Sequence, residues 1–247
     1  TPVVTNAGGT TTFVAGLDYE IDAFGKLNVL NFTNIPEGST ILVDFSKLNI
    51  AAVTDASLIG GITAGVRTGF ELFKEAISLF GYSPKILICP TFCENAAVAA
   101  QMIVSADYLR AINIIDAPQG TAVSVAIAGR GPSGTLAGFQ TSNKRTFLWY
   151  SYVKAYDEAT DAQRLRPGSQ YVAGIISANE NYWESPSNTE IKSITGVEKV
   201  LTAAINDANS EVNQLNEVGV SSIFTAFGTG FRTWGNRNAS FPSNSQA

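Results

Sequence analysis

The sequence predicts an α/β protein in two parts: a small β-rich unit, sandwich-like or barrel-like, in residues 1–52, and a larger three-layer α/β/α unit in residues 53–247. Apolar and polar residues alternate at period two in the first part, as is typical of half-buried strands. From about Thr54, short apolar runs alternate with longer helical segments, which favours a mainly parallel sheet covered by helices. A length of 247 residues, 45% of them apolar, is enough to fill such a core.

In the first part, the alternating stretches and their turn signals are residues 11–32 and 39–48, with turns at 23–26 and 35–38. Asp18, Glu20 and Asp22 share the strand face opposite Tyr19. A calcium loop would need a bidentate Glu where Val29 stands. We therefore expect the three acids to form a solvated strand face.

The second part opens with the stretch "FELFKEAISLFG" at residues 70–81. Its spacing predicts a helix with Phe70, Phe73, Ile77 and Phe80 on one apolar face. Gly81 stands where a left-handed C-terminal cap is expected.

The elements that follow are predicted from apolar runs, Ala content and Gly/Ser-rich breaks. In order they are a strand at 85–89, a helix at 94–110, a strand at 111–118, a loop at 129–143, a strand at 144–153, a loop at 157–168, helices at 170–178 and 205–219, a strand at 220–227, and a last strand or hairpin arm at 230–241. In the helix at 170–178, Ala173, Gly174 and Ser177 are expected to pack closely on the sheet.

Composition limits the partners. Charged residues make up 15% of the chain and the net charge is −5. Both values disfavour electrostatic binding to nucleic acid or anionic lipid over a large surface. No run approaches the ~20 apolar residues that a bilayer span needs. We expect neither nucleic acid nor membrane as a partner. The chain starts without Met, so we interpret it as a fragment or a processed product.

The chain contains no histidine, and this limits the catalytic chemistry. Ser-His-Asp and Cys-His nucleophiles both need an imidazole to accept the proton. Cys89 and Cys93 lack further zinc ligands of the usual kind and have the wrong spacing for a thioredoxin-type pair. We interpret them as reduced, packed thiols at a strand end, and expect no metal and no cofactor.

Other candidate sites give weak signals. Ser151 and Lys154 have SxxK spacing, but residues three apart on a strand face opposite sides. The glycines at 129–134 and near residue 228 match no phosphate loop and are interpreted as turns. Asp116 ends a strand and is expected to form loop-start hydrogen bonds. The acids that could supply a catalytic carboxylate pair are Asp116, Asp157, Glu158, Asp161 and Glu184.

An unusual stretch at residues 182–191 predicts a rigid elbow. Pro186 holds the backbone, while Ser185, Ser187 and Asn188 can bond local amides. Trp183 is expected to anchor the elbow in the core.

Three stretches in this order resemble the signature of contractile-tail sheath proteins of phages and related injection machines: "NYWESPSNTEIKSITGV" at 181–197, "QLNEVGVSSI" at 214–223 and "GFRTWGNRNASF" at 230–241. Residues 58–76 are similar to the family's entry into its α/β domain, and residues 81–118 to the helix, the strand and the LRAI-strand-Asp-x-Pro pattern that follow it. The resemblance covers about residues 55–241.

The resemblance implies a subtilisin-like α/β domain without protease activity, in a structural subunit that polymerises around an inner tube and contracts to drive it through a target envelope. Implied partners are other sheath subunits, the inner tail tube protein and the baseplate. The implied location is the virion tail, assembled in the bacterial host cytoplasm. Family members usually carry an N-terminal arm and a C-terminal domain that this chain lacks, so we expect this piece to be monomeric.

The terminal stretch at 228–241 could line a ligand site, because Trp, Arg and Asn often do so. With the resemblance, we interpret Trp234 as a side chain that fills the core at a joint of the chain. Gly235 is interpreted as the residue that allows the turn there. Asn236 and Arg237 are then expected to bond the backbone, and the chain from Ser240 onward to fray. The alternatives are a carbohydrate- or protein-binding module of a virion or cell surface, or an α/β hydrolase.

Overall fold

The computed structural model describes residues 2–23, 25–46, 49–130, 133–181, 183–204, 206–226 and 228–243. The chain forms two compact units: residues 1–53 with 157–162, and residues 54–156 with 163–247.

The first unit contains two two-stranded antiparallel sheets, β1 (Val3–Asn6) with β4 (Ile41–Asp44) and β2 (Tyr19–Ile21) with β3 (Leu27–Val29), followed by a 3-10 turn η1 (Ile50–Ala52). Its small core consists of Val4, Phe13, Tyr19 and Ile35. The predicted β-rich texture is therefore confirmed.

The interpretation of Asp18 as part of a solvated face is wrong. Its carboxylate is buried and accepts hydrogen bonds from the Val14 amide at 2.8 Å and from the Asn34 side chain at 2.7 Å. These bonds, the first above all, lower the pKa of Asp18, while Glu20 stays exposed. Local alternation could not reveal this, because Asn34 lies outside the strand.

The second unit is built on a five-stranded sheet in the order β14-β13-β9-β8-β7. The strands are β7 (Ile86–Ile88), β8 (Ile112–Asp116), β9 (Thr146–Trp149), β13 (Val220–Ala226) and β14 (Gly230–Trp234). The first four run parallel and β14 pairs antiparallel with β13. The prediction of a mainly parallel sheet is confirmed, as is the final hairpin arm.

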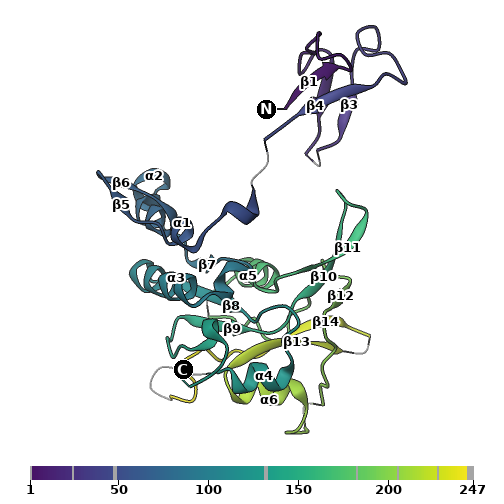
Figure 1. Cartoon of the computed structure of the whole chain (residues 1–247). Helices are drawn as coiled ribbons and strands as arrows, with labels where there is room; N and C mark the ends of the chain where they lie inside the picture. The colour runs from purple at the N-terminus through teal and green to yellow at the C-terminus, as the bar shows by residue number, and fades with distance from the viewer. Residues whose placement is uncertain are drawn as a thin grey trace. The chain divides into compact units, whose positions relative to one another are not determined.

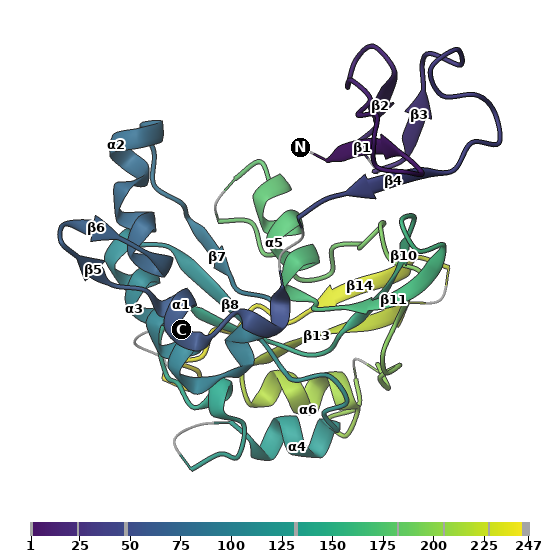
Figure 2. The ribbon, with the colours of Figure 1, turned by 45° about the horizontal axis from the view of Figure 1, so that its top comes forward.

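Helices cover both faces of this sheet (Figures 1 and 2). The first face carries α3 (Ala96–Leu109), α4 (Val123–Ala128) and α6 (Glu211–Glu217), whose apolar side chains share one core with β9 and β13. The other face carries α5 (Ser169–Ala178), which packs on Ile114, Trp149 and Ile223. The result is an α/β unit of three layers. No described helix is long and apolar enough to cross a membrane.

The remaining elements of this unit are α1 (Asp55–Ile59), the hairpin β5 (Ile62–Thr63) and β6 (Val66–Arg67), the 3-10 turns η2 (Gly69–Glu75), η3 (Phe92–Glu94) and η4 (Ala137–Phe139), and α2 (Ala76–Phe80). A smaller sheet has the order β11-β10-β12, made of β10 (Val153–Asp157), β11 (Ala162–Arg166) and β12 (Gly196–Val197).

The helix expected at 70–81 forms only in part. Residues 69–75 are a 3-10 turn and only 76–80 are α-helical, with Gly81 at φ 79° as the expected cap. Phe70 is buried, but Ile77 and Phe80 are exposed. The apolar face predicted by periodicity exists, and only its first half meets the core.

Other elements also differ from expectation. The segment at 144–153 splits into β9 and the start of β10, and the loop at 157–168 contains β11. In α5 the sheet contacts come from Val172, Ala173, Ile175 and Ile176, whereas Gly174 and Ser177 are exposed. The expected packing of small residues on the sheet is therefore confirmed for Ala173 and wrong for Gly174 and Ser177, because branched side chains fill the rest of the layer.

Candidate functional site

The elbow and the terminal motif lie together as one joint. The elbow residues Pro186–Thr189 run along the outer edge of β14. The Asn188 amide donates to the Thr233 carbonyl at 2.7 Å, and the Thr233 amide donates back to the Thr189 carbonyl at 3.0 Å. Asn188 adopts φ 63°, a left-handed conformation that Asn tolerates better than most residues.

Hydroxyl groups hold this joint from inside. Thr233 is 1% exposed, and its Oγ1 donates to the Pro186 carbonyl while accepting from the Thr189 amide at 3.1 Å. Ser185 Oγ accepts from the Ser187 amide at 3.2 Å, which closes the elbow turn. The buried hydroxyl of Thr233 therefore satisfies polar backbone groups of the elbow.

The turn after β14 is made by Gly235. Its φ of 106° is outside the range that side chains favour, and its amide donates to Ser187 Oγ at 3.1 Å. A Cβ at this position would lie 2.9 Å from Ser221 Oγ and 3.2 Å from Ser221 Cα. Trp234 packs against the main core, with its ring edge-to-face on Phe224 at 5.5 Å.

The segment after the turn is tied to α6. Arg237 donates to the Asn216 carbonyl at 2.8 Å and forms an ion pair with Glu217 at 3.1 Å. Its guanidinium stacks on the Phe241 ring at 3.9 Å. The predicted backbone bond of Arg237 is confirmed. The one expected for Asn236 is wrong, since Asn236 is exposed and has no hydrogen bond among the described residues.

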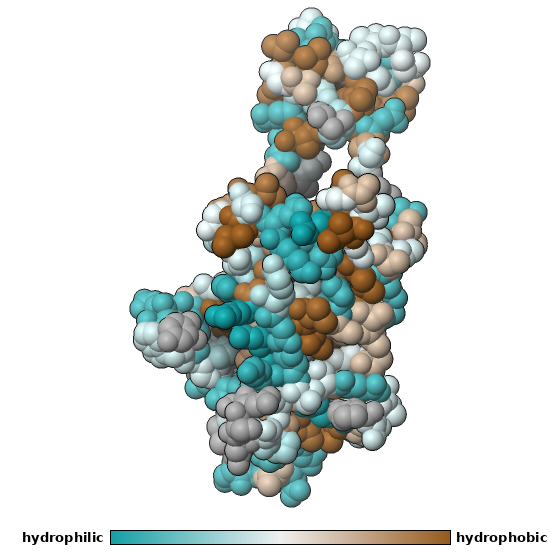
Figure 3. Space-filling model, turned by 90° about the vertical axis from the view of Figure 1, so that its left-hand side faces the viewer, coloured by the Kyte–Doolittle hydropathy of each residue, from teal (hydrophilic) through white to brown (hydrophobic). Residues whose placement is uncertain are grey.

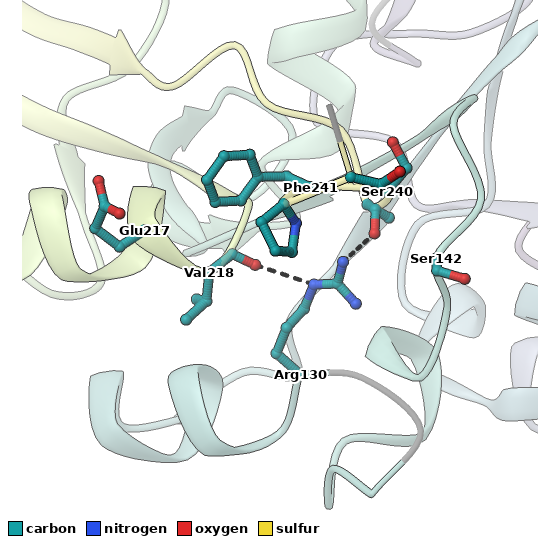
Figure 4. Close-up of a pocket in the computed structure, with 9 residues that line it drawn as sticks. Arg130, Ser142, Glu217, Val218, Ser240 and Phe241 are labelled. Carbon is teal, nitrogen blue, oxygen red and sulfur yellow. Dashed lines mark hydrogen bonds between the residues drawn. The ribbon is translucent and has the colours of Figure 1, made fainter. Parts of the chain in front are cut away.

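Arg130 is the centre of a pocket of about 590 Å³ beside this segment (Figure 4). It donates to the Val218 carbonyl at 3.0 Å, to the Thr141 carbonyl at 2.5 Å and to the Ala239 carbonyl. Burial lowers the pKa of this guanidinium. Because its donors meet backbone carbonyls, Arg130 joins three segments and does not offer a free anion site.

Two expectations about the joint are wrong. Trp183 is 69% exposed and does not anchor the elbow in the core; the main-chain ladder with β14 does so instead. Ser240 is not frayed: it is buried, and its hydroxyl donates to Asn238 Oδ1 at 2.6 Å. Its neighbour Ala239 donates its amide to the Thr146 carbonyl at 2.7 Å, which fixes the segment to β9. Residues 244–247 lie outside the described part.

Asp116 has the expected loop-start role at the carboxyl end of β8. It is 2% exposed and accepts from the Ser169 amide at 2.8 Å and from the Ser169 hydroxyl at 2.5 Å. Burial raises the pKa of Asp116 to about 6, although the Ser169 bonds oppose the rise. The other candidate acids do not share this burial: Asp157 is half-buried, and Glu158, Asp161 and Glu184 are exposed.

The remaining candidates are the two cysteines and the pair Ser151 and Lys154. Cys89 and Cys93 are free thiols, and Cys93 is buried in the core with its Sγ 3.8 Å from Asp116 Oδ2. Ser151 is buried and Lys154 exposed, as the strand argument predicts. Among the residues that the structure describes, no three His, Cys, Asp or Glu side chains group as metal ligands.

The glycine clusters were interpreted as turns. Gly228 and Gly230 have φ of 75° and 76° in the β13–β14 turn. In the other cluster, Gly131 and Pro132 lie outside the described residues.

Sequence reasoning missed Arg130 and Ser169. Arg130 follows an apolar helix and stands between two glycines, and Ser169 follows Pro-Gly at a helix start. Both signals are weak, because nothing local identifies the distant carbonyls or the carboxylate that these residues bind.

Comparison with known proteins gives a consistent class. Residues 65–239 match the family model described as phage tail sheath protein central domain. The chain therefore belongs to the phage tail sheath protein family, and the resemblance inferred from the sequence is confirmed.

Individual relatives agree. The chain is 41% identical to the tail sheath protein of Burkholderia phage BcepMu, a match covering 98% of this chain and 52% of that protein. It is 35% identical to a putative prophage major tail sheath protein of Pseudomonas aeruginosa, over 76% of this chain and 47% of that protein. The chain spans about half the length of the curated relatives it matches.

A solved structure supports the fold. A chain in the cryo-EM structure of the anti-feeding prophage baseplate has a TM-score of 0.50 at 17% identity, covering 72% of this chain and 44% of that one.

Proposed function

We propose that the chain is part of a structural, non-enzymatic subunit of a contractile tail sheath, which polymerises around an inner tube and contracts to drive it through a target envelope. The observation that carries the proposal is the match of residues 65–239 to the central domain of tail sheath proteins. The proposed partners are further sheath subunits, the inner tail tube protein and the baseplate. The proposed location is the virion tail, assembled in the host cytoplasm.

Two finer points belong to the same proposal. The unit from residue 53 onward is subtilisin-like in topology, with the β-rich unit of residues 1–52 as a separate domain. The elbow and the terminal stretch together form a structural motif that has no catalytic or ligand-binding role. Its residues are Trp183, Ser185, Pro186, Ser187, Asn188, Trp234, Gly235, Asn236 and Arg237. The free cysteines and the hydroxyl ladder of the joint are consistent with this role.

A sheath that contracts once needs subunits that remain rigid while their contacts change. The joint supports that requirement. Thr233, Ser187 and Gly235 connect segments about 45 residues apart in sequence through buried or half-buried hydrogen bonds. Such bonds stabilise one arrangement of the two segments, because separating them leaves a buried polar group without a hydrogen-bond partner.

The proposal can be tested by grafting. The matching segment of the BcepMu tail sheath gene is replaced by this chain, and phage particles are imaged by electron microscopy. We expect sheathed tails that shorten on contraction, as with the BcepMu segment re-inserted through the same junctions. A soluble chimera beside naked tubes would count against the proposal. A second chimera carrying Gly235→Val should lose the sheath if the joint is needed for subunit rigidity.

A further inference from the structure

A hydrophobic patch lies exposed on the second unit, where α2 and α3 reach the surface. It consists of Ile77, Phe80, Tyr82, Val104 and Tyr108, and is called the α2–α3 patch below. These side chains are between 56 and 69% exposed. Figure 3 faces the side of the chain that carries α2 and α3 and shows hydrophobic side chains there beside polar ones.

The turn η2 links the two parts of the patch, because it contacts both α2 and α3. Lys74 Nζ lies 5.0 Å from the centre of the Tyr108 ring, which connects η2 to α3. Ile77 and Phe80 follow Lys74 at steps of three residues, a spacing that places helical side chains on one face. The Phe80 and Tyr82 rings are 6.3 Å apart. Val104 lies one turn before Tyr108 on α3.

Two ion pairs lie beside the patch. Lys74 pairs with Glu71 at 2.8 Å, and Arg67 pairs with Glu75 at 3.2 Å. The five side chains of the patch are themselves uncharged, so the patch has no charge of its own to bind a polyanion or an anionic lipid. Its chemistry fits a neutral, apolar protein surface.

We propose that the α2–α3 patch is the surface on which a second copy of this chain docks. The inference rests on the proposed function, which supplies many copies of the chain side by side. With roughly 150–250 Å² for each whole side chain of the three aromatic residues, and less for Ile77 and Val104, the exposed fractions add up to on the order of 550 Å². One partner contributes about 800 Å² to a standard interface, so the patch supplies about two thirds of one side. In an open array the contact is head-to-tail, and the patch meets a different surface of the neighbour.

The sequence alone led us to expect a monomer, whereas the patch leads us to expect association that rises with concentration. Sedimentation velocity of the 247-residue chain tests this over a wide concentration range. Phe80→Glu and Val104→Glu place a charge on the patch from two different helices, and each should weaken association at least about tenfold. The control is Val200→Glu, because Val200 is 69% exposed outside α2 and α3. Circular dichroism and thermal unfolding verify that each variant is folded.

The outcomes separate this proposal from the sheath function. Association that both patch variants weaken, that Val200→Glu leaves unchanged and that about 0.5 M salt does not weaken supports the patch. Association that the patch variants leave intact overturns the docking surface and leaves the sheath function standing. A chain that is monomeric at every concentration overturns the docking proposal, while the grafted phage still decides the sheath function.

Discussion

Gly235 donates its backbone amide to the hydroxyl oxygen of Ser187, 3.1 Å away, across 48 residues of sequence. This bond closes the joint between the elbow and the end of β14. Gly235 adopts a φ of 106°, so the chain turns immediately after this bond. The joint is the feature that connects the two most unusual stretches of the sequence.

Replacing Gly235 by Ala should destabilise the second unit by roughly 1–3 kcal/mol, because an L-residue is strained at this φ. The new Cβ would also meet Ser221, so the loss falls at the upper end of that range. Urea unfolding followed by tryptophan fluorescence measures the change.

The matched control is Gly174→Ala. Gly174 lies exposed inside α5, and a Cβ there meets nothing within 4 Å. This substitution should stabilise the chain by about 0.5–1 kcal/mol. Equal effects of the two substitutions would contradict the geometry of the joint.

Thr233→Val should cost about 1–3 kcal/mol, because the shape is kept while the Pro186 carbonyl and the Thr189 amide lose a buried partner. Thr233→Ser retains the hydroxyl and should recover most of the loss. Hydrogen exchange should show faster exchange of the Thr189 amide in the Val variant alone. Normal protection of that amide in the Val variant would refute the role of the hydroxyl.

Arg130→Met should destabilise the chain by at least about 2 kcal/mol, since hydrogen bonds from a charged donor are worth more than neutral ones. The variant leaves the carbonyls of Val218, Thr141 and Ala239 without this donor. Limited proteolysis should then cut near residues 239–243. Lys144→Met removes an exposed cation and should change neither readout.

Asp116 should make the stability depend on pH between about 4 and 6. Burial raises its folded pKa to about 6, above an unfolded value near 3.9. The folded state therefore binds more protons in this window, and stability present below pH 4 is lost as the pH rises through 6. The loss amounts to roughly 2–3 kcal/mol for two pKa units.

Asp116→Asn keeps the shape and stays neutral, so the free energy of unfolding of the variant minus that of the wild type should rise across this window. Urea unfolding at several pH values measures the difference. Glu180→Gln, at an exposed acid, should show no such trend. A flat difference for Asp116→Asn would mean that Asp116 is ionised without penalty in the folded chain.

The sequence was informative where a local rule decides the structure. Short apolar runs predicted β7, β8 and β13, and the spacing of Phe70 and Gly81 predicted where a helical segment would begin and end. It was misleading where the outcome depends on distant partners. Asp18 is buried and bonded by Asn34, and Ile77 is exposed because no described residue covers it.

The elbow and the terminal motif were each recognisable in the sequence, and so was the family. Their contact with each other was not, because the bonds of Thr233 and Ser187 form only when segments about 45 residues apart become neighbours. Trp183 illustrates the same limit: a large aromatic residue predicts a core anchor, yet the backbone ladder holds the elbow and leaves the ring exposed.

The sequence by itself determined the alternation of strands and helices and the membership of the sheath family, since these depend on residue type, spacing and order. Only the tertiary structure decided that Arg130 binds carbonyls of three segments, that Ser169 holds Asp116, and that the α2–α3 patch is exposed. Such features depend on which groups lie close together in the folded chain. Tertiary contacts between distant segments, and not the local sequence, decide which groups are buried and which form hydrogen bonds.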